Sequence, residues 1–507
     1  MKYLIYAYLY VQDSVVNVMA SSKDLHRLLF AKKIEKYRWV IGRWRAWRTY
    51  NLALKHVPAY KDFVKKQAGE VPKWHAPKTA LDPIPEMDKK SYIKTHKIED
   101  LCYGGKLPTK GVVVDESSGS SGQPTSWVRG PYERFMIKKI LQVVFSESTG
   151  NKPVFVINAF ALGAWATGMN VSASLTDSSI IKSTGPDIDK IITTLDQFGT
   201  NYSYVILGYP PFLKNLADDE RIDLSKYDVI AGYGGEGLSE NMRRYLLKSF
   251  KRVTGSYGAS DLEINIAVET DFTIALRNSI ENNEELRNEL IRTEYGVLPM
   301  VFQYNPYDYV IESNDNGELL VTIARKENIS PRIRYNIHDR GHVIRLKNLR
   351  PILEKHNLGK LDDHIRLDMP ILFHYGRSDM SVDYYGANVT PDSIRQVLYD
   401  QPEIAKRMNT FNLAKVEDKN HNQNMVVNVE FREGEDNKLE NNKKIAEEFF
   451  KQLSELNKDF YNAYYNTAPD GSKAQLNFFK FGTGPFEGSG KKLKNEYVKT
   501  DLKYDKL

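Results

Sequence analysis

The sequence predicts an α/β protein with a large N-terminal domain and a small α+β C-terminal domain. A chain of 507 residues, 41% of them hydrophobic, can bury more than one core, because single cores stop growing at roughly 250 to 300 residues. From Gly111 onward, short apolar segments alternate with glycine turns and helical stretches, as in α/β domains. This pattern changes after about Asp379, so we place the domain boundary there.

Residues 1–44 are predicted to form an N-terminal helical extension. The run Met1–Val11 is apolar and aromatic, but Gln12 and Asp13 interrupt it long before the roughly 20 residues that a membrane span needs. Between residues 23 and 66, tryptophans recur at helical spacing among arginines. We favour aromatic side chains packed on the main domain, with solvated arginines, over a helix that binds a membrane surface or a partner. Membrane association is therefore not expected.

Residues 45–378 are expected to form the large domain. Four short apolar strands stand out in this region: Val112–Val114, Val154–Ile157, Tyr204–Leu207 and Val229–Ala231. Helical stretches separate them, which predicts a largely parallel sheet. Residues 379–507 are expected to form the small C-terminal domain, where 426–431 alternates like a strand with one wet face and 438–465 resembles a long amphipathic helix.

Charge and cysteine content narrow the class of function. The net charge of +6 is small for this length; it suits anionic small molecules such as nucleotides and is too weak to indicate nucleic-acid binding. Cys102 is the only cysteine, which excludes an intramolecular disulfide and the paired-cysteine zinc patterns. We therefore expect a reducing, cytoplasmic compartment.

A loop dense in glycine and hydroxyl side chains follows the first predicted strand. It contains Ser117, Ser118, Gly119, Ser120, Ser121 and Gly122. Such a loop offers backbone N–H groups and hydroxyl donors to phosphate oxygens, and large side chains would block that approach. It is not a P-loop, because no Gly-Lys-Ser/Thr follows at the required spacing. A flexible linker is the alternative for this composition taken alone.

Further motifs follow this loop in a fixed order. They are Gly234-Gly235-Glu236, Tyr257-Gly258-Ala259-Ser260-Asp261, Arg334-Tyr335-Asn336-Ile337-His338-Asp339, Gly376-Arg377-Ser378-Asp379, Gly386-Ala387-Asn388-Val389-Thr390-Pro391 and Ser489-Gly490-Lys491. Together they resemble the adenylate-forming (AMP-forming) ligase superfamily, and within it the phenylacetate-CoA ligase-like branch. The resemblance covers roughly residues 45 to 500. It implies a large multi-sheet N-terminal domain of the adenylate-forming type and a mobile C-terminal domain.

The resemblance implies a nucleotide site. Tyr257 offers a flat ring for adenine, and a carboxylate at Asp339 suits the two ribose hydroxyls. Arg377 adds a charged donor for the ribose or phosphate. The other residues expected at the adenine and ribose are Gly235, Glu236 and Gly258.

The resemblance also implies the catalytic and metal-binding residues. Lys491 is expected to be the principal catalytic residue, because an ammonium can bridge the attacking carboxylate and the α-phosphate as negative charge builds up. Lys492 and Lys494 are the competing positions, and an ordinary basic tail is the alternative. Asp379 falls at the family's interdomain hinge, and Asp261 at the residue that helps to hold Mg²⁺.

The sequence indicates which residues could bind the acid, but it does not identify the acid. Phe160, Trp165, Tyr233 and Ala259 are the candidates to line an acyl pocket, and the resemblance implies an aryl or medium-sized apolar acid. Trp165 is equally compatible with a plain core position.

Three residues depart from the family pattern. Gln123 replaces a lysine found in many relatives, Asp261 replaces a glutamate, and Met380 replaces a second aspartate after the hinge. The first removes a positive charge from the phosphate loop, and the second shortens the reach of the metal ligand by one methylene.

The implied reaction joins ATP and a carboxylic acid to give acyl-AMP and pyrophosphate, after which an acceptor displaces AMP. Coenzyme A is the favoured acceptor. An amine, giving amide synthesis, and simple adenylyl transfer are the alternatives. A noncatalytic nucleotide-binding protein on the same fold is the alternative of a different class. The oligomeric state stays open between a monomer and a homodimer.

Overall fold

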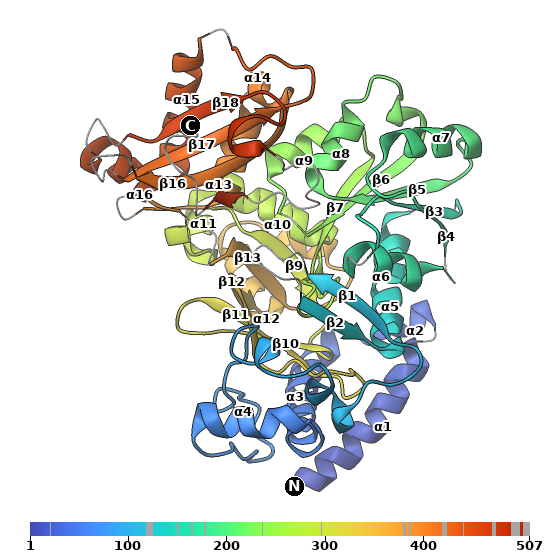
Figure 1. The fold of residues 1–507 in the computed structure, drawn as a ribbon. Coiled ribbons are helices and arrows are strands. Elements are labelled where there is room, and N and C mark those ends of the chain that lie inside the picture. Colours follow the sequence, from blue (N-terminus) through green and yellow to red (C-terminus); the bar gives the residue numbers. More distant parts are fainter. Residues whose placement is uncertain are drawn as a thin grey trace.

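The computed structural model describes most of the chain: residues 1–20, 22–117, 125–149, 152–163, 166–176, 179–235, 237–295, 297–378, 382–384, 387–417, 423–439, 441–468, 473–487 and 497–499. At the lower end of the molecule in Figure 1 lie helices of the N-terminal region. These helices are α1 (Lys2–Ala20), α2 (Lys23–Leu28), α3 (Glu35–His56) and α4 (Pro58–Ala68). Helix α3 runs through residue 44 without a break, so the predicted extension continues directly into the large domain.

The N-terminal helices are packed on the body, as predicted. Ile5 and Leu9 of α1 and Trp47 of α3 belong to the main hydrophobic cluster. The expectation of solvated arginines is wrong for Arg45 and Arg48, which are 3% and 5% exposed. A buried guanidinium needs an anionic partner, and no local pattern in the sequence indicates which residue that partner is.

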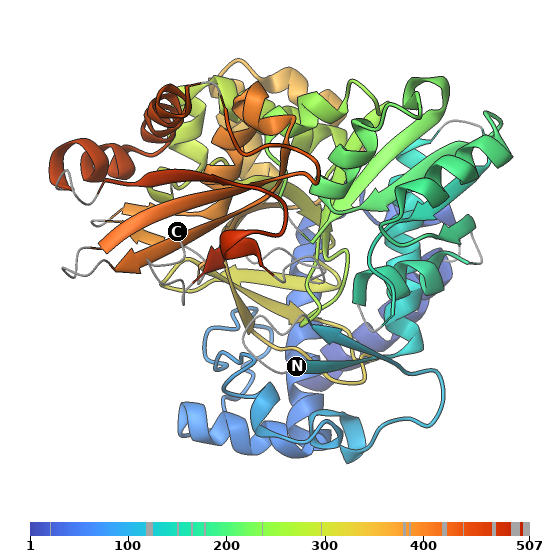
Figure 2. The same ribbon diagram turned by 45° about the horizontal axis from the view of Figure 1, so that its top comes forward.

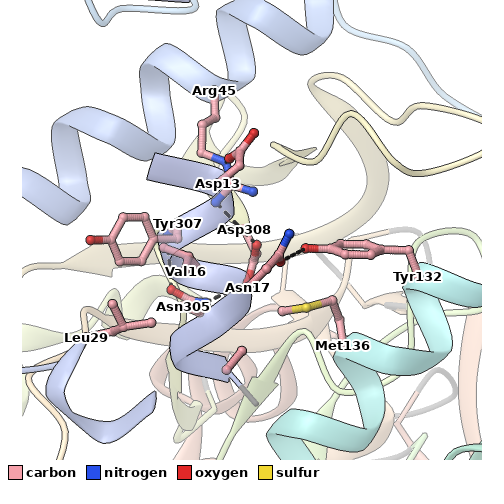
Figure 3. Close-up of a pocket in the computed structure, with 11 residues that line it drawn as sticks. Asp13, Val16, Asn17, Leu29, Arg45, Tyr132, Met136, Asn305, Tyr307 and Asp308 are labelled. Carbon is pink, nitrogen blue, oxygen red and sulfur yellow. Dashed lines mark hydrogen bonds and ion pairs between the residues drawn. The ribbon is translucent and has the colours of Figure 1, made fainter. Parts of the chain in front are cut away.

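Two buried arginines of α3, Arg45 and Arg48, are paired with Asp13 of α1. Nη1 of Arg48 lies 2.7 Å from Oδ2 of Asp13, and Nε of Arg45 lies 3.5 Å from Oδ1. Arg45 also lies 3.7 Å from Asp308, and Lys326 lies 3.7 Å from Asp13. Figure 3 shows Asp13 and Arg45 facing each other beside Asp308. This one carboxylate therefore holds α1 against α3 and the loops of the sheet.

One sheet of eleven strands forms the body of the large domain. Its order is β10-β11-β12-β13-β9-β8-β7-β6-β5-β3-β4. The strands are β3 (Val154–Asn158), β4 (Ile180–Ser183), β5 (Ser203–Gly208), β6 (Asp228–Gly234), β7 (Arg252–Tyr257), β8 (Ala267–Val268), β9 (Met300–Tyr304), β10 (Tyr309–Ser313), β11 (Glu318–Ile323), β12 (Tyr335–Ile344) and β13 (Ile371–Arg377). The predicted strands of 154–157, 204–207 and 229–231 are confirmed.

The two halves of this sheet differ in direction. Strands β4, β3, β5, β6 and β7 are parallel, whereas the pairs from β7 to β10 are antiparallel. The sheet is thus mixed, and the prediction of a largely parallel sheet holds for one half only. The helices that accompany the sheet are α5 (Pro131–Ser148), α6 (Ala166–Leu175), α7 (Ile188–Phe198), α8 (Pro210–Ala217), α9 (Glu240–Leu246), α10 (Asp271–Asn282), α11 (Glu284–Leu290) and α12 (Leu346–Lys355).

The C-terminal part has a hydrophobic cluster of its own, which runs from Val382 to Tyr497. Its sheet has the order β18-β17-β16-β19. The elements are β14 (Val382–Tyr384), β15 (Ala387–Val389), α13 (Pro391–Asp400), α14 (Pro402–Ala405), β16 (Met408–Glu417), β17 (Gln423–Phe431), α15 (Asn442–Leu456), α16 (Lys458–Tyr461), β18 (Gln475–Phe479) and β19 (Val498–Lys499). The predicted strand 426–431 lies in β17, while the predicted helix 438–465 is divided at Asn457. Figure 2 shows this part, in orange and red, beside the main sheet.

Within the described part of the chain, every helix is too short or too polar to cross a membrane.

Replacing Asp13 with alanine should destabilise the protein. The change leaves the buried guanidinium of Arg48 without its carboxylate and Arg45 with Asp308 alone, at 3.7 Å, and breaking a buried ion pair in this way costs about 3 to 5 kcal/mol. Urea denaturation followed by circular dichroism measures the free energy of unfolding. The control is Asp62→Ala on the exposed side of α4, where we expect a change within about 0.5 kcal/mol. Equal stability of the two variants would contradict the pairing.

Candidate active site

The candidate site centres on a contact between Tyr257 and Asp339. Tyr257 ends β7 and Asp339 lies in β12, and the tyrosine hydroxyl donates a 2.7 Å hydrogen bond to Oδ2 of Asp339. The Tyr257 ring lies against His374 of β13, with ring centroids 4.7 Å apart. The fold therefore joins two motif residues that are 82 positions apart.

The Asp339 carboxylate is only 4% exposed. Nε2 of His374 lies 3.2 Å from Oδ2, and Nε of Arg377 lies 3.9 Å from Oδ1. Burial alone would raise the pKa of Asp339, but His374, Arg377 and the hydrogen bond from Tyr257 outweigh burial and lower it. The Arg377 side chain is 42% exposed. A buried anion thus lies beside a solvent-facing cation, an arrangement that suits a ligand with both hydroxyl and phosphate groups.

Two motif glycines lie where a side chain would collide with a neighbour. A Cβ on Gly258 would come within 2.7 Å of the backbone oxygen of Glu263, so glycine lets the loop after β7 close on itself. Gly235, just after β6, has a φ of +79°, and a Cβ there would lie 2.7 Å from the ring of Tyr209. Gly235 is exposed, which leaves its backbone accessible at the end of the strand.

The strands on either side of the predicted phosphate loop form the β1 (Val113–Ser117) and β2 (Thr125–Arg129) hairpin, in which Ser117 pairs with Thr125. The guanidinium of Arg129 donates to the backbone oxygens of Ser260 and Leu262. Its Nε also donates to Asp115, at 2.9 Å. The hairpin is thereby fixed to the loop that follows Tyr257.

Asp261 lies in that same loop. It accepts a 2.8 Å hydrogen bond from the hydroxyl of Tyr335, and Nζ of Lys89 lies 3.6 Å from its other oxygen. Among the described residues, no three His, Cys, Asp or Glu side chains form a metal-binding group. A single partly exposed carboxylate is compatible with Mg²⁺, because this ion is commonly held by one or two carboxylates together with substrate phosphates.

Three of the predicted acyl-pocket residues, Phe160, Tyr233 and Ala259, lie in the described part of the chain. Phe160 packs edge-on against Tyr209, with ring centroids 5.2 Å apart, in a cluster with parts of β3 and β5. Tyr233 belongs to the main hydrophobic cluster, against which Ala259 also packs. The hydroxyl of Tyr233 accepts a hydrogen bond from Arg243. The ring of Phe160 also lies 3.8 Å from where a Cβ on Gly234, the neighbour of Tyr233, would stand, and the acyl pocket stays a prediction.

Several predicted residues lie outside the described part of the chain, and their roles remain predictions. They are Ser118, Gly119, Ser120, Ser121, Gly122, Gln123, Trp165, Glu236, Asp379, Met380, Lys491, Lys492 and Lys494.

The residue before the predicted hinge is held by Glu318. Ser378 donates a 2.5 Å hydrogen bond to Oε1 of Glu318, and its backbone N–H donates to the oxygen of His338. Asn336 donates to the other Glu318 oxygen, at 2.8 Å. Burial opposes ionisation, but these hydrogen bonds outweigh it and lower the pKa of Glu318 to about 2. The chain thus leaves β13 from a firmly bonded position.

Contacts between the C-terminal part and the large domain lie next to this site. A guanidinium N–H of Arg395 in α13 donates to the backbone oxygen of Gly237, at 3.4 Å. Arg432 forms an ion pair with Asp218. A small cavity here is lined by His374, Arg395 and other residues of both parts. These contacts are mainly polar, as in interfaces that permit domain motion.

Two residues of the site, His374 and Arg129, were not predicted from the sequence. Arg129 could have been found from its position in the hairpin around the Ser/Gly loop. Asp115 and Arg129 are diagonal neighbours on one face of that hairpin and carry opposite charges. No local pattern distinguishes His374, because its contact with Asp339 depends on the register of β12 and β13.

The chain has the fold of the adenylate-forming ligases, which confirms the fold that the motifs imply. It is similar to a solved structure of 2-hydroxyisobutyryl-CoA ligase in the postadenylation state in complex with R3-HIB-AMP, at 13% identity and a TM-score of 0.66, over 93% of this chain and 90% of the ligase. The thioesterification-state structure of that ligase, with 2-HIB-AMP and CoA, matches at 14% identity and a TM-score of 0.51, over 94% and 91%. No protein-family model and no curated protein matches the sequence.

Replacing Tyr257 with phenylalanine should lower the free energy of unfolding at pH 7 by about 1.5 to 3 kcal/mol. The change removes a hydrogen bond to a buried charged group, and that range is typical for such a loss. Urea denaturation provides the measurement. Tyr3→Phe is the matched control, because Tyr3 is 83% exposed. If both variants unfold like the unmodified protein, the hydroxyl of Tyr257 does not stabilise the fold through Asp339.

Glu318 should contribute to stability above pH 4.5, its ordinary pKa, and lose that contribution as the pH falls from 4.5 toward about 2. The sign follows from a pKa that is lower in the folded state than in the unfolded chain. In Glu318→Gln, the stability difference between pH 7 and pH 3 should shrink by about 1 to 2 kcal/mol, a figure reduced for partial solvation. Glu285→Gln, at an exposed position of α11, should leave the difference unchanged. An unchanged slope in Glu318→Gln would refute this assignment.

Proposed function

We propose that this protein is an ATP-dependent, AMP-forming acid ligase that works in the cytoplasm. It activates a carboxylic acid as acyl-AMP with release of pyrophosphate, and then transfers the acyl group to coenzyme A. The observation that carries the proposal is the cluster of Tyr257, Asp339 and Arg377 beside the fixed hairpin of the predicted phosphate loop. The adenylate-forming fold and the order of the motifs support it.

In this proposal, each described residue has a defined task toward the nucleotide. Asp339 is ionised and accepts hydrogen bonds from the ribose hydroxyls. The Tyr257 ring lies at the adenine, and its hydroxyl orients the Asp339 carboxylate. Arg377 faces solvent and meets the ribose or the phosphate. Asp261 is the residue that would hold Mg²⁺, which neutralises charge on the phosphates when it is bound.

The bond-forming step requires one oxygen of the acid to attack the α-phosphate as pyrophosphate leaves. Two anions approach each other in that step, so a nearby cation lowers the barrier. We assign this role to Lys491. Arg129 positions the phosphate loop relative to Asp261 through the backbone oxygens of Ser260 and Leu262. It acts through the backbone and is therefore a positioning residue.

The acceptor is proposed to be coenzyme A because 2-hydroxyisobutyryl-CoA ligase, whose fold is similar, is named for that acceptor. An acid of aryl or medium apolar type remains the proposed substrate class. Two departures from the family pattern bear on ATP: Asp261 stands in place of a glutamate, and Gln123 in place of a lysine. We expect them to weaken the affinity for the triphosphate without removing the reaction.

Exchange of labelled pyrophosphate into ATP, over a panel of aryl, fatty and amino acids, tests the first step. The exchange should depend on one class of acid and fall at least about 100-fold in Lys491→Ala. Lys480→Ala is the matched control, because Lys480 is an exposed lysine of the same C-terminal part, and it should retain full exchange. Equal activity of the two variants would refute the role of Lys491.

Adding coenzyme A or candidate amines after acyl-AMP has formed then identifies the acceptor. Formation of an acyl-CoA thioester supports the proposal. Formation of an amide would show that the acceptor is an amine and not coenzyme A. ATP binding without exchange for any acid would favour a noncatalytic nucleotide-binding protein.

A further inference from the structure

Helix α1 presents two very different faces. The inner face is buried through Ile5, Leu9, Asp13 and Ala20. Besides the ion pairs of Asp13, Asn17 accepts a 3.0 Å hydrogen bond from Tyr132 of α5, as Figure 3 shows. These contacts fix the rotation of α1 about its axis, so the opposite face is held toward solvent.

The outer face of α1 is an apolar stripe. Its five members recur at intervals of three or four residues, which places them along one side of the helix. They are Leu4, Tyr8, Val11, Val15 and Val18, with exposed fractions of 71%, 47%, 62%, 51% and 67%. Tyr3 and Tyr10, which are seven residues apart and so share one side of the helix, both flank the stripe on the same side and are 83% and 68% exposed. At a rise of 1.5 Å per residue, the stripe is about 21 Å long.

The stripe carries no charge. The charged residues of α1 are Lys2, which donates to Asn51, and Asp13, which is buried. Ten of the nineteen large hydrophobic residues that the described chain exposes lie within residues 1–28. Single exposed hydrophobic residues need no explanation, but a gathering of this kind on one helix marks an interaction surface.

The basic residues that follow α1 indicate what kind of partner its exposed apolar face would bind. Between Ser22 and Trp39, the exposed charged side chains that the structure describes are Lys32, Lys33 and Lys36. Glu35, in the midst of them, is buried and paired with Arg345. A neutral apolar face followed by exposed lysines complements a bilayer with anionic headgroups, where tyrosine is enriched at the interface and lysine meets lipid phosphate.

A second copy of the chain suits this face less well. A helix of 19 residues is about 28 Å long and about 10 Å wide. Two such faces would together bury roughly 600 Å², whereas stable protein interfaces bury about 1,200 to 2,000 Å². A membrane surface has no such minimum area, because every apolar side chain that enters it contributes.

The geometry points to α1 as a helix that lies in the surface of an anionic lipid bilayer and holds the protein there. Leu4, Val11 and Val18 enter the boundary between headgroups and acyl chains, and Tyr3 and Tyr10 lie at the headgroup level. The binding is reversible, because one helix face gives modest affinity. This inference concerns a surface remote from the Tyr257–Asp339 cluster and does not depend on the proposed reaction.

Flotation of the full chain with vesicles tests the inference. Vesicles of phosphatidylcholine mixed with anionic phosphatidylglycerol should carry the protein upward, and vesicles of pure phosphatidylcholine should carry less of it. In Val11→Glu/Val15→Glu, the bound fraction should fall at least about tenfold, because two charges would enter the apolar boundary. The matched control is Met169→Glu/Ile180→Glu, at residues that are 40% and 43% exposed on other elements; it should bind like the unmodified protein.

A second variant and a second measurement keep the test decisive. Lys32→Ala/Lys33→Ala/Lys36→Ala should weaken binding to the anionic vesicles and leave binding to neutral vesicles unchanged. Thermal unfolding of all variants confirms that they are folded. The inference is overturned if neither vesicle binds the unmodified protein, or if the α1 variant binds as well as the control. It is also overturned if light scattering shows a dimer that Val11→Glu/Val15→Glu converts to a monomer.

Discussion

The hydrogen bond between Tyr257 and Asp339 links the two halves of the main sheet at the candidate site. Tyr257 belongs to the last parallel strand, β7, and Asp339 to the antiparallel half. His374, on β13 between them, contacts both residues. Tyr257, Asp339 and His374 therefore lie together only because of the order and register of the strands in the mixed sheet. A shift of β12 by one residue would turn Asp339 to the opposite face.

A buried polar network supports the loop that follows Tyr257. Glu263 accepts a 2.6 Å hydrogen bond from Tyr309 and a 2.8 Å hydrogen bond from Asn328, and it is paired with Arg325. Asn328 also reaches Glu133, whose pKa is raised by burial and by the nearby charge of Glu263. A network of this kind is costly unless every member is bonded. Because Glu263 stands two residues after Asp261, these bonds fix the end of the loop that contains Ser260 and Asp261.

The parallel strands could be predicted from the sequence, and the motifs could be recognised in it, because both depend on local patterns. It did not predict the burial of Arg45 and Arg48, because their partner Asp13 lies more than 30 residues away and an arginine among tryptophans looks like a surface residue. Helix α1 lies within the predicted N-terminal helical extension, residues 1–44, but its exposed stripe is visible only once its inner face is known. His374 depends on strand register, for which a single sequence gives little sign.

The polar boundary between the C-terminal part and the large domain has a consequence for the conditions under which the two stay in contact. Each part keeps its own hydrophobic cluster, and Tyr399 of α13 packs partly against both. Separating the parts would therefore expose little apolar surface, whereas the ion pair of Arg432 and Asp218 would be exchanged for water and counterions. Contacts of that kind weaken as dissolved salt screens the charges. Raising the salt concentration should therefore weaken the contact of Arg432 with Asp218 between the two parts.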